Sequence, residues 1–305
     1  MADVHAATWK SWPTFRMMHH VTSFYRFIPF TPARLEGLRA EIEQFMETAE
    51  IKGLVILAEE GINATICGSA DAIRNFKMRL STWLGAEGTT FKDSTSEKLP
   101  FRRVGVVIRP EIVTLKRSDL RPRDERSHLS PAEWHEWLTS GREFTLVDTR
   151  NAYETKAGKF RGAVDPGLKH FSDWDAYLDQ ADLPKDKPVL MYCTGGIRCE
   201  KAILLMREKG WGEIYQLKDG ILAYLEEFPE GEYEGECYVF DERVAVDPHL
   251  RPTERWFNCP GCGLTSENPR TCEVCGAACA ICEDCQTSWP WVCSKRCRDR
   301  LRQLQ

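Results

Sequence analysis

The sequence predicts a multidomain α/β protein built from a ferredoxin-like α+β sandwich, a parallel α/β domain and a cysteine-rich, zinc-binding C-terminus. The first third alternates strand and helix patterns in ferredoxin-like order, and the middle third alternates short apolar runs with helical segments. Nine of the 13 cysteines fall within residues 259–297. The expected parts are an N-terminal tail (1–22), a ferredoxin-like domain (23–115), a basic linker (116–129), the second domain (130–235), a connector (236–258) and the cysteine-rich region (259–305).

The ferredoxin-like domain is expected to run strand, helix, strand, strand, helix, strand. Its first helix starts at Thr31-Pro32, an N-cap followed by proline at the first helical position, and Ser69 can cap the second. The turn at 59–63 joins the middle strands, and its Gly and Asn fit ordinary turn chemistry as well as a site. The expected strands are Ser23–Ile28, Leu54–Ala58, Ala64–Cys67 and Val104–Ile108.

The second domain begins with a capping box, Ser130-Pro131-Ala132-Glu133, after a charged linker that we expect to be exposed. Three short apolar runs predict buried parallel strands at Thr145–Asp148, Val189–Tyr192 and Ile214–Leu217. In such sheets ligands bind at the carboxyl ends of the strands. Asp148 and Cys193 both fall at strand ends, so we expect the functional site there.

Composition indicates a soluble, intracellular protein. Of the 305 residues 42% are hydrophobic and 29% charged, and no apolar run is long enough to span a membrane. The first 13 residues lack the apolar core of a signal peptide. Cysteines clustered in short pairs indicate metal binding in a reducing compartment, so the cytoplasm is the expected location.

Charge is unevenly distributed along the chain. The formal net charge of −5 disfavours nucleic-acid binding as a bulk property, but residues 98–126 hold nine Lys or Arg against four acids. Five more bases follow Gln286. Since phosphates respond to local charge, we predict that Arg121, Arg123 and Arg126 contact RNA, the alternative being a solvated linker and tail.

Residues 189–201 carry the strongest functional signal. An apolar run ends at Cys193, a glycine-containing loop follows, and a helix-like segment begins at Cys199. If the loop wraps around the sulfur, backbone N–H groups and the helix dipole favour the thiolate. We therefore predict that Cys193 is the catalytic nucleophile, the alternative being a buried core cysteine. The predicted pocket loop comprises Thr194, Gly195, Gly196, Ile197 and Arg198.

Three more residues are assigned to this pocket. An aspartate at a buried strand end needs a cation or N–H donors, so we expect Arg150 and Arg198 to organise the pocket with Asp148. Of these we expect Arg198 to face the ligand and Asp148 to be structural. Cys199 is either a resolving thiol for an oxidised Cys193 or a helix-start residue that packs inward.

The C-terminal cysteines have the spacing of metal ligands. Two cysteines separated by two residues present two thiolates from one turn. Two such cysteine pairs complete a tetrahedral zinc site. We expect two ions, divided in chain order, although interleaved pairing stays equally open because Cys279 lies between the sets. An iron–sulfur cluster is the alternative occupant. The ligands are Cys259, Cys262, Cys272 and Cys275 for one ion and Cys282, Cys285, Cys293 and Cys297 for the other.

These motifs resemble a known family. The Cys193–Arg198 loop, and a strand ending in Asp148-x-Arg150 with Glu154 after it, resemble the active-site region of rhodaneses. Four longer strings narrow the resemblance, which runs from about Phe24 to the C-terminus, to the rhodanese-type tRNA uridine hydroxylases. They are Glu60–Thr65, Asp148–Glu154, Cys193–Lys201 and Cys237–Arg243.

The resemblance implies a rhodanese-like second domain and an enzyme that uses molecular oxygen to convert the wobble uridine of tRNA to 5-hydroxyuridine. The base would leave its stack and enter a pocket, where addition of the Cys193 thiolate to C6 makes C5 electron-rich. The sequence has no flavin fingerprint and no His-His-carboxylate triad, so it leaves the oxygen-activating agent unassigned.

Two other functions stay open. A general rhodanese would take sulfur from thiosulfate or another small thiol or sulfur donor as a Cys193 persulfide. A non-catalytic RNA-binding scaffold is the third hypothesis, and the intact Cys193 loop argues against it.

Asp219 stands where rhodanese-like relatives commonly carry glycine, and we expect it to cap the following helix. The sequence carries no signal for the oligomeric state.

Overall fold

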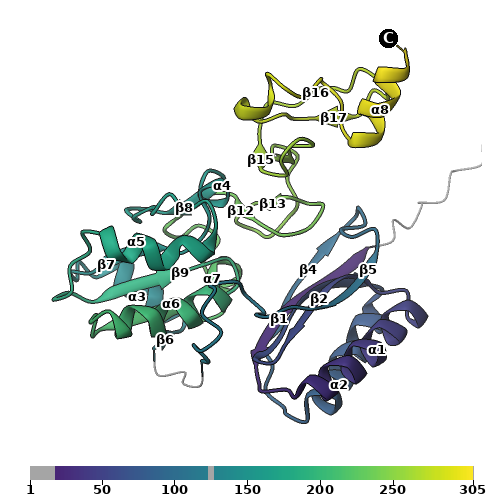
Figure 1. Ribbon diagram of the computed structural model, residues 1–305. Coiled ribbons are helices and arrows are strands. Elements are labelled where there is room, and N and C mark those ends of the chain that lie inside the picture. Colours follow the sequence, from purple (N-terminus) through teal and green to yellow (C-terminus); the bar gives the residue numbers. More distant parts are fainter. Residues whose placement is uncertain (1–17, 123–126, 305) are drawn as a thin grey trace, which may run out of the picture.

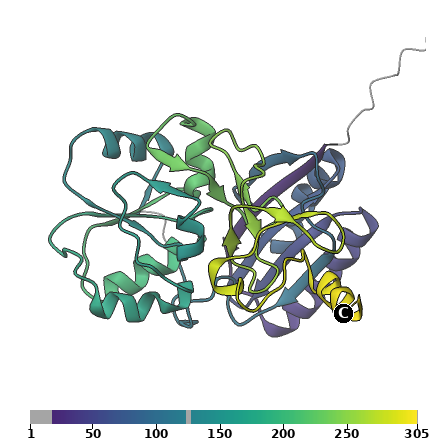
Figure 2. The ribbon, with the colours of Figure 1, turned by 90° about the horizontal axis from the view of Figure 1, so that it is seen from above.

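The computed structural model describes residues 18–122 and 127–304 and shows two α/β lobes with a connector between them (Figure 1). The cysteine-rich region lies above the N-terminal lobe in Figure 1 and overlies it when seen from above (Figure 2). Within the described ranges no helix is both long enough and apolar enough to cross a membrane.

The N-terminal domain is one five-stranded sheet, in the order β4-β1-β3-β2-β5, with two helices on its outer face (Figure 1). Strands β1 to β4 pair antiparallel, whereas β5 runs parallel to β2. Thr31 and Ser69 cap the two helices, as predicted. The elements are β1 (His19–Phe27), α1 (Pro32–Thr48), β2 (Lys52–Ala58), β3 (Gly61–Gly68), α2 (Ala70–Leu84), β4 (Lys92–Ser96) and β5 (Val104–Ile108).

The two faces of this sheet have different roles because side chains alternate along each strand. Phe24, Val55 and Ala64 point to the helices and join the buried core. Their neighbours on the same strands face the second domain and line a cavity described below. The cavity-lining neighbours are Ser23, Tyr25, Leu54, Ile56, Asn63 and Thr65.

The sequence prediction for this domain was incomplete at its edges. The strand next to β1 is β4, a polar segment that was not predicted, and Val104–Ile108 is instead a fifth strand at the opposite edge. Strand β4 carries polar side chains on both faces, so it lacks the alternation of apolar and polar residues by which a strand is predicted from sequence. Strand β1 begins at His19, inside the predicted tail.

The second domain is a parallel four-stranded sheet, ordered β6-β10-β9-β7, with helices on both faces. The three strands that the sequence predicted, β7, β9 and β10, lie where the sequence placed them. The elements are β6 (His128–Leu129), α3 (Pro131–Thr139), β7 (Thr145–Asp148), α4 (Ala152–Thr155), β8 (Gly158–Phe160), a 3₁₀ turn η1 (Phe171–Asp173), α5 (Trp174–Gln180), β9 (Val189–Tyr192), α6 (Ile197–Glu208), β10 (Ile214–Leu217) and α7 (Gly220–Glu227).

Each face of the parallel sheet has its own core. Leu146 and Leu190 pack with α3 and α7, whereas Val147 and Met191 pack with α5 and α6. The segment before this domain is less exposed than predicted, because Leu120 is buried in the second of these cores. Strand β6, also in the predicted linker, pairs with β10.

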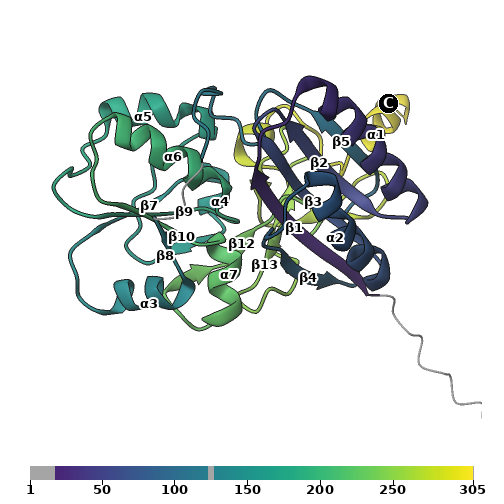
Figure 3. The ribbon, with the colours of Figure 1, turned by 90° about the horizontal axis from the view of Figure 1, so that it is seen from below.

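The connector and the cysteine-rich region consist of short strand pairs. Strand β11 pairs antiparallel with β8, and β12 pairs with β13 between the two lobes (Figure 3). The remaining elements are β11 (Tyr233–Gly235), β12 (Cys237–Tyr238), β13 (Ala245–Val246), β14 (Phe257–Asn258), β15 (Thr265–Ser266), β16 (Arg270–Thr271), β17 (Ala278–Cys279), the 3₁₀ turn η2 (Glu283–Cys285) and α8 (Lys295–Leu304).

Candidate active site

Cys193 follows β9 and lies against the N-terminus of α6. The backbone N–H of Gly196 donates a hydrogen bond to the Cys193 sulfur at 3.1 Å. Gly196 has a φ of 94°, which favours glycine, and a Cβ there would stand 2.9 Å from the Tyr25 hydroxyl and displace it. The loop therefore curls around the sulfur as the sequence predicted, although the side chain is 0% exposed.

The surroundings of Cys193 favour its thiolate. Burial raises the pKa of Cys193, but a hydrogen bond from Cys199, the charge of Arg198 and the N–H groups at the start of α6 outweigh burial and lower the pKa to about 6. Burial and the neighbouring Cys193 charge raise the pKa of Cys199 well above its usual value. Near neutral pH the pair is therefore a Cys193 thiolate and a Cys199 thiol.

Cys199 is fully buried and points inward. Its sulfur lies 3.4 Å from the Thr149 hydroxyl, and the side chain belongs to the core on the α5 and α6 face. Of the two positions considered for Cys199, the structure shows the inward-packing one. Its thiol nevertheless contacts Cys193.

Arg198 is held by a buried partner that the sequence reasoning did not single out as a site residue. Its guanidinium makes a two-pronged ion pair with Glu154, with one contact at 2.9 Å, and Glu154 also accepts the N–H of Asn151. Arg198 lines the cavity and lies 5.7 Å from the centroid of the Phe240 ring. A planar guanidinium fixed in this way supplies a positive charge of constant position near Cys193.

Asp148 and Arg150 lie behind the cavity wall. Both are fully buried and form a bidentate ion pair, with contacts at 2.9 and 2.6 Å, and Arg150 also donates to the Gly158 carbonyl. Neither lines the cavity, so any effect of Arg150 on the pocket is indirect. This ion pair is placed to support the carboxyl end of β7.

The N-terminal domain covers one side of the Cys193 loop. The Tyr25 hydroxyl donates to Glu200 at 2.8 Å, and Lys92 pairs with Asp219 at 3.0 Å. Asp219 is the N-cap residue of α7, as predicted, but its side chain makes no cap hydrogen bond. Asp219 has a φ of 59°, and its carboxylate joins the loop after β10 to the edge strand β4.

A buried charge cluster joins the two domains. Lys201, one turn into α6, is 0% exposed and contacts Glu60 at 2.7 Å and Glu111 at 2.6 Å. Glu60 also accepts the N–H of Ile112 at 2.8 Å. Since every partner is fixed, this cluster sets where the turn after β2 lies relative to the Cys193 helix.

The two domains and the connector enclose a cavity with a volume of about 590 Å³, a size typical of small-molecule sites. Cys193, Thr194, Gly195, Ile197 and Arg198 of the predicted loop line it. Within the described ranges the Thr194 hydroxyl has no hydrogen-bond partner. The opposite wall comes from the open face of the N-terminal sheet, and the third wall from residues 239–250.

The predicted RNA-binding arginines are only partly described. Arg121 is exposed and its guanidinium lies 3.8 Å from Glu59, whereas Arg123 and Arg126 fall outside the described residues. Other bases of the same zone, Lys98, Arg102 and Arg117, have acidic partners. Much of the local positive charge is therefore already balanced.

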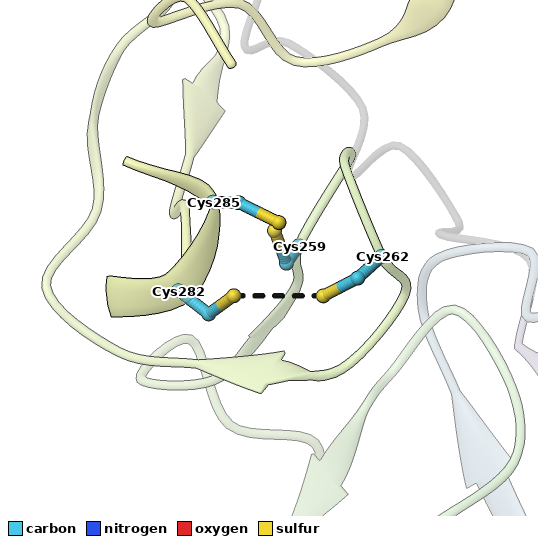
Figure 4. Close-up of side chains that lie close together, drawn as sticks. All are labelled: Cys259, Cys262, Cys282 and Cys285. Carbon is cyan, nitrogen blue, oxygen red and sulfur yellow. Dashed lines mark hydrogen bonds between the residues drawn. The ribbon is translucent and has the colours of Figure 1, made fainter. Parts of the chain in front are cut away.

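The C-terminal cysteines form two sets of four, and in each set the sulfurs lie within 4.8 Å of one another. Figure 4 shows the first set, in which the sulfurs of Cys262 and Cys282 are 3.5 Å apart. The partition in chain order is wrong, because the two sets interleave. They are Cys259, Cys262, Cys282 and Cys285, and Cys272, Cys275, Cys293 and Cys297. Cys279 belongs to neither set and packs in the small core beside them.

A parallel α/β domain that holds a cysteine thiolate in such a loop defines a rhodanese-domain protein. Family models agree: a rhodanese-like domain matches residues 130–227, a UPF0176 acylphosphatase-like domain matches 19–112, and a rhodanase C-terminal domain matches 234–298. The solved rhodanese-like domain of an Anabaena protein is 23% identical, covering 36% of this chain and 80% of that chain with a TM-score of 0.31.

Curated relatives identify the particular family. A tRNA uridine(34) hydroxylase of Bdellovibrio bacteriovorus is 41% identical over 93% of this chain and 81% of its own length. Proteins of the same name from Teredinibacter turnerae and Rhizobium leguminosarum are 39% and 38% identical over 88% and 93% of this chain, and over 84% and 92% of their own lengths. The chain belongs to the tRNA uridine(34) hydroxylase family, which confirms the resemblance found in its motifs.

Proposed function

We propose that this chain hydroxylates uridine 34 of tRNA at C5 and that Cys193 is its nucleophile. The observation that carries the assignment is the Cys193 thiolate at a cavity walled by both domains and the connector. A cavity of about 590 Å³ has room for a flipped base, which is much larger than a small sulfur anion. Family membership supports the same reaction.

The chain's residues would activate the uracil ring as follows. The Cys193 thiolate adds to C6, and the electron pair of the C5–C6 double bond moves toward C5 and the C4 carbonyl. C5 then attacks an electrophilic oxygen donor. Loss of the C5 proton and departure of the thiolate restore the ring, while Arg198 stabilises the thiolate at each end of the cycle.

Molecular oxygen is the proposed co-substrate. One of its atoms enters the product, and the other leaves as water after two electrons and two protons arrive from an external donor, a role that two small thiols can fill by forming a disulfide. We place the reaction in the cytoplasm, where tRNA is the proposed partner, with Arg121, Arg123 and Arg126 as proposed contacts to the RNA backbone.

Nucleoside mass spectrometry of tRNA tests the function. Cells that lack this protein should lose 5-hydroxyuridine and its derivatives at position 34, and the wild-type chain should restore them. A chain carrying Cys193→Ala should not. Restoration by that variant would remove Cys193 from the mechanism, whereas unchanged tRNA combined with thiosulfate turnover would favour sulfur transfer.

The metal sites are proposed to hold zinc. A tetrahedral Zn–S₄ site with bonds of about 2.3 Å places its sulfurs roughly 3.8 Å apart. The closest sulfurs in the second set, at 3.5 and 3.6 Å, are near this spacing. Four thiolates leave no open position for substrate, so the role is structural.

Metal analysis of purified protein is expected to return about two zinc ions per chain. Cys272→Ser should lower this content to one or fewer, because three thiolates remain in its set. Cys279→Ser is the matched control, since Cys279 lies in the same region outside both sets. A variant Cys279→Ser that loses zinc, or a wild-type content below about one, would contradict the assignment.

A further inference from the structure

We propose that Phe240 is the platform on which the target nucleobase stacks, an inference that rests on the proposed function. Phe240 follows β12 and lines the same cavity as Cys193. Its side chain is 53% exposed, although it carries no polar atom. When a flat ligand covers a large apolar ring that is exposed in a cavity, apolar surface leaves water, and this favours binding.

The Phe240 ring is held by its neighbours. Tyr238 contacts it edge-on, with ring centroids 5.1 Å apart and planes at 85°. Arg198 lies 5.7 Å from its centroid. Arg198 also lowers the pKa of Cys193, so one guanidinium links the aromatic ring to the thiolate. A base stacked on Phe240 would lie in the cavity that Cys193 also lines.

The turn that carries Phe240 is braced from both sides. Arg243 makes a bidentate ion pair with Asp241 and donates to Ser94 of β4 at 2.8 Å. Val244 has a φ of 63°, a left-handed conformation that is strained for a β-branched residue. These contacts hold the turn from which the Phe240 ring faces the cavity.

Stacking suits the chemistry that Cys193 would perform. Every base has a π-face, and an aromatic side chain can replace the neighbour that a flipped base leaves behind. Attack on C6 requires the ring plane to be fixed relative to the sulfur, which one stacked face accomplishes. Phe240 would thus position the base without taking part in bond formation.

A binding experiment with two RNA hairpins tests this role. Both are fluorescently labelled anticodon stem-loops, one with uridine at the wobble position and the other abasic there, and fluorescence polarisation reports their affinity. Phe240→Ala should weaken binding of the uridine hairpin by about 5- to 150-fold, the range expected for one base–aromatic stack. The abasic hairpin should bind both proteins equally.

Two control variants test whether the effect comes from misfolding or from the loss of any exposed apolar side chain. Phe240→Trp keeps a stacking face and should retain uridine-hairpin affinity. Met78→Ala removes an equally apolar side chain, 62% exposed on α2, and should change neither affinity. Equal weakening of both hairpins by Phe240→Ala, or no weakening of either, would overturn the proposal.

The same samples separate this inference from the proposed function. If wild-type protein distinguishes the uridine hairpin from the abasic one through Phe240 but forms no 5-hydroxyuridine with oxygen and a thiol, the stacking site stands and the hydroxylase assignment fails. If hydroxylation proceeds and Phe240→Ala leaves hairpin affinity and turnover unchanged, the stacking role fails and the assignment stands.

Discussion

Replacement of Cys193 by serine is expected to abolish tRNA hydroxylation, with a loss of at least about 10³-fold, while the fold stays intact. Serine matches cysteine in shape, but its hydroxyl is neutral at pH 7 and cannot supply the anion that adds to C6. Turnover of an in vitro transcribed tRNA, followed by nucleoside mass spectrometry, measures the loss. A Cys193→Ser enzyme within tenfold of wild type would contradict covalent catalysis by this residue.

The pH dependence provides an independent check. Because the pKa of Cys193 is lowered to about 6, the thiolate fraction and the alkylation rate should rise between pH 5 and 7 and then level off. Cys237 is the control, because it is also a buried free thiol, and burial raises its pKa to about 12. Site-resolved labelling should modify Cys193 and spare Cys237 at pH 7. A Cys193 midpoint near 9 would remove the rationale for its reactivity.

Lys201→Met is expected to destabilise the protein by about 3–5 kcal/mol, because it leaves Glu60 and Glu111 buried without their cation. A lower denaturation midpoint measures this. Burial already raises the pKa of Glu60, so the folded variant binds a proton more tightly than the unfolded chain. The variant should therefore regain stability as the pH falls toward the ordinary carboxyl range.

An exposed ion pair supplies the control for Lys201. Lys187 contacts Glu143 at 2.8 Å on the surface, and Lys187→Met should cost less than about 1 kcal/mol. Adding Glu60→Gln to Lys201→Met should recover part of the loss, since one buried charge disappears. Equal destabilisation by the two lysine variants would show that the buried cluster contributes no more than a surface pair.

The features that the sequence predicted well are local ones. The strands Thr145–Asp148, Val189–Tyr192 and Ile214–Leu217 match to the residue, because short apolar runs fully buried on both faces are bounded by polar turns. The turn around Cys193 was likewise predicted from glycines and a helix start. The eight metal-set cysteines were recognised from pair spacing alone.

The features that it missed depend on residues distant in the chain. Tyr25 and Glu200, or Lys201 and Glu60, meet only because the sheet of one domain packs on the helix of the other. No periodicity encodes such a pairing. Lys92 lies on a polar edge strand that has no apolar pattern, so its contact with Asp219 was invisible as well.

The two cysteine sets interleave along the C-terminal region, so each spans part of the other. The chain visits the first cluster at Cys259, the second at Cys272, the first again at Cys282 and the second again at Cys293. An ion in either set would close a loop that contains half of the other set, and closing that loop would reduce the chain entropy that filling the other set must overcome. We therefore expect the two sets to fill together and to empty together.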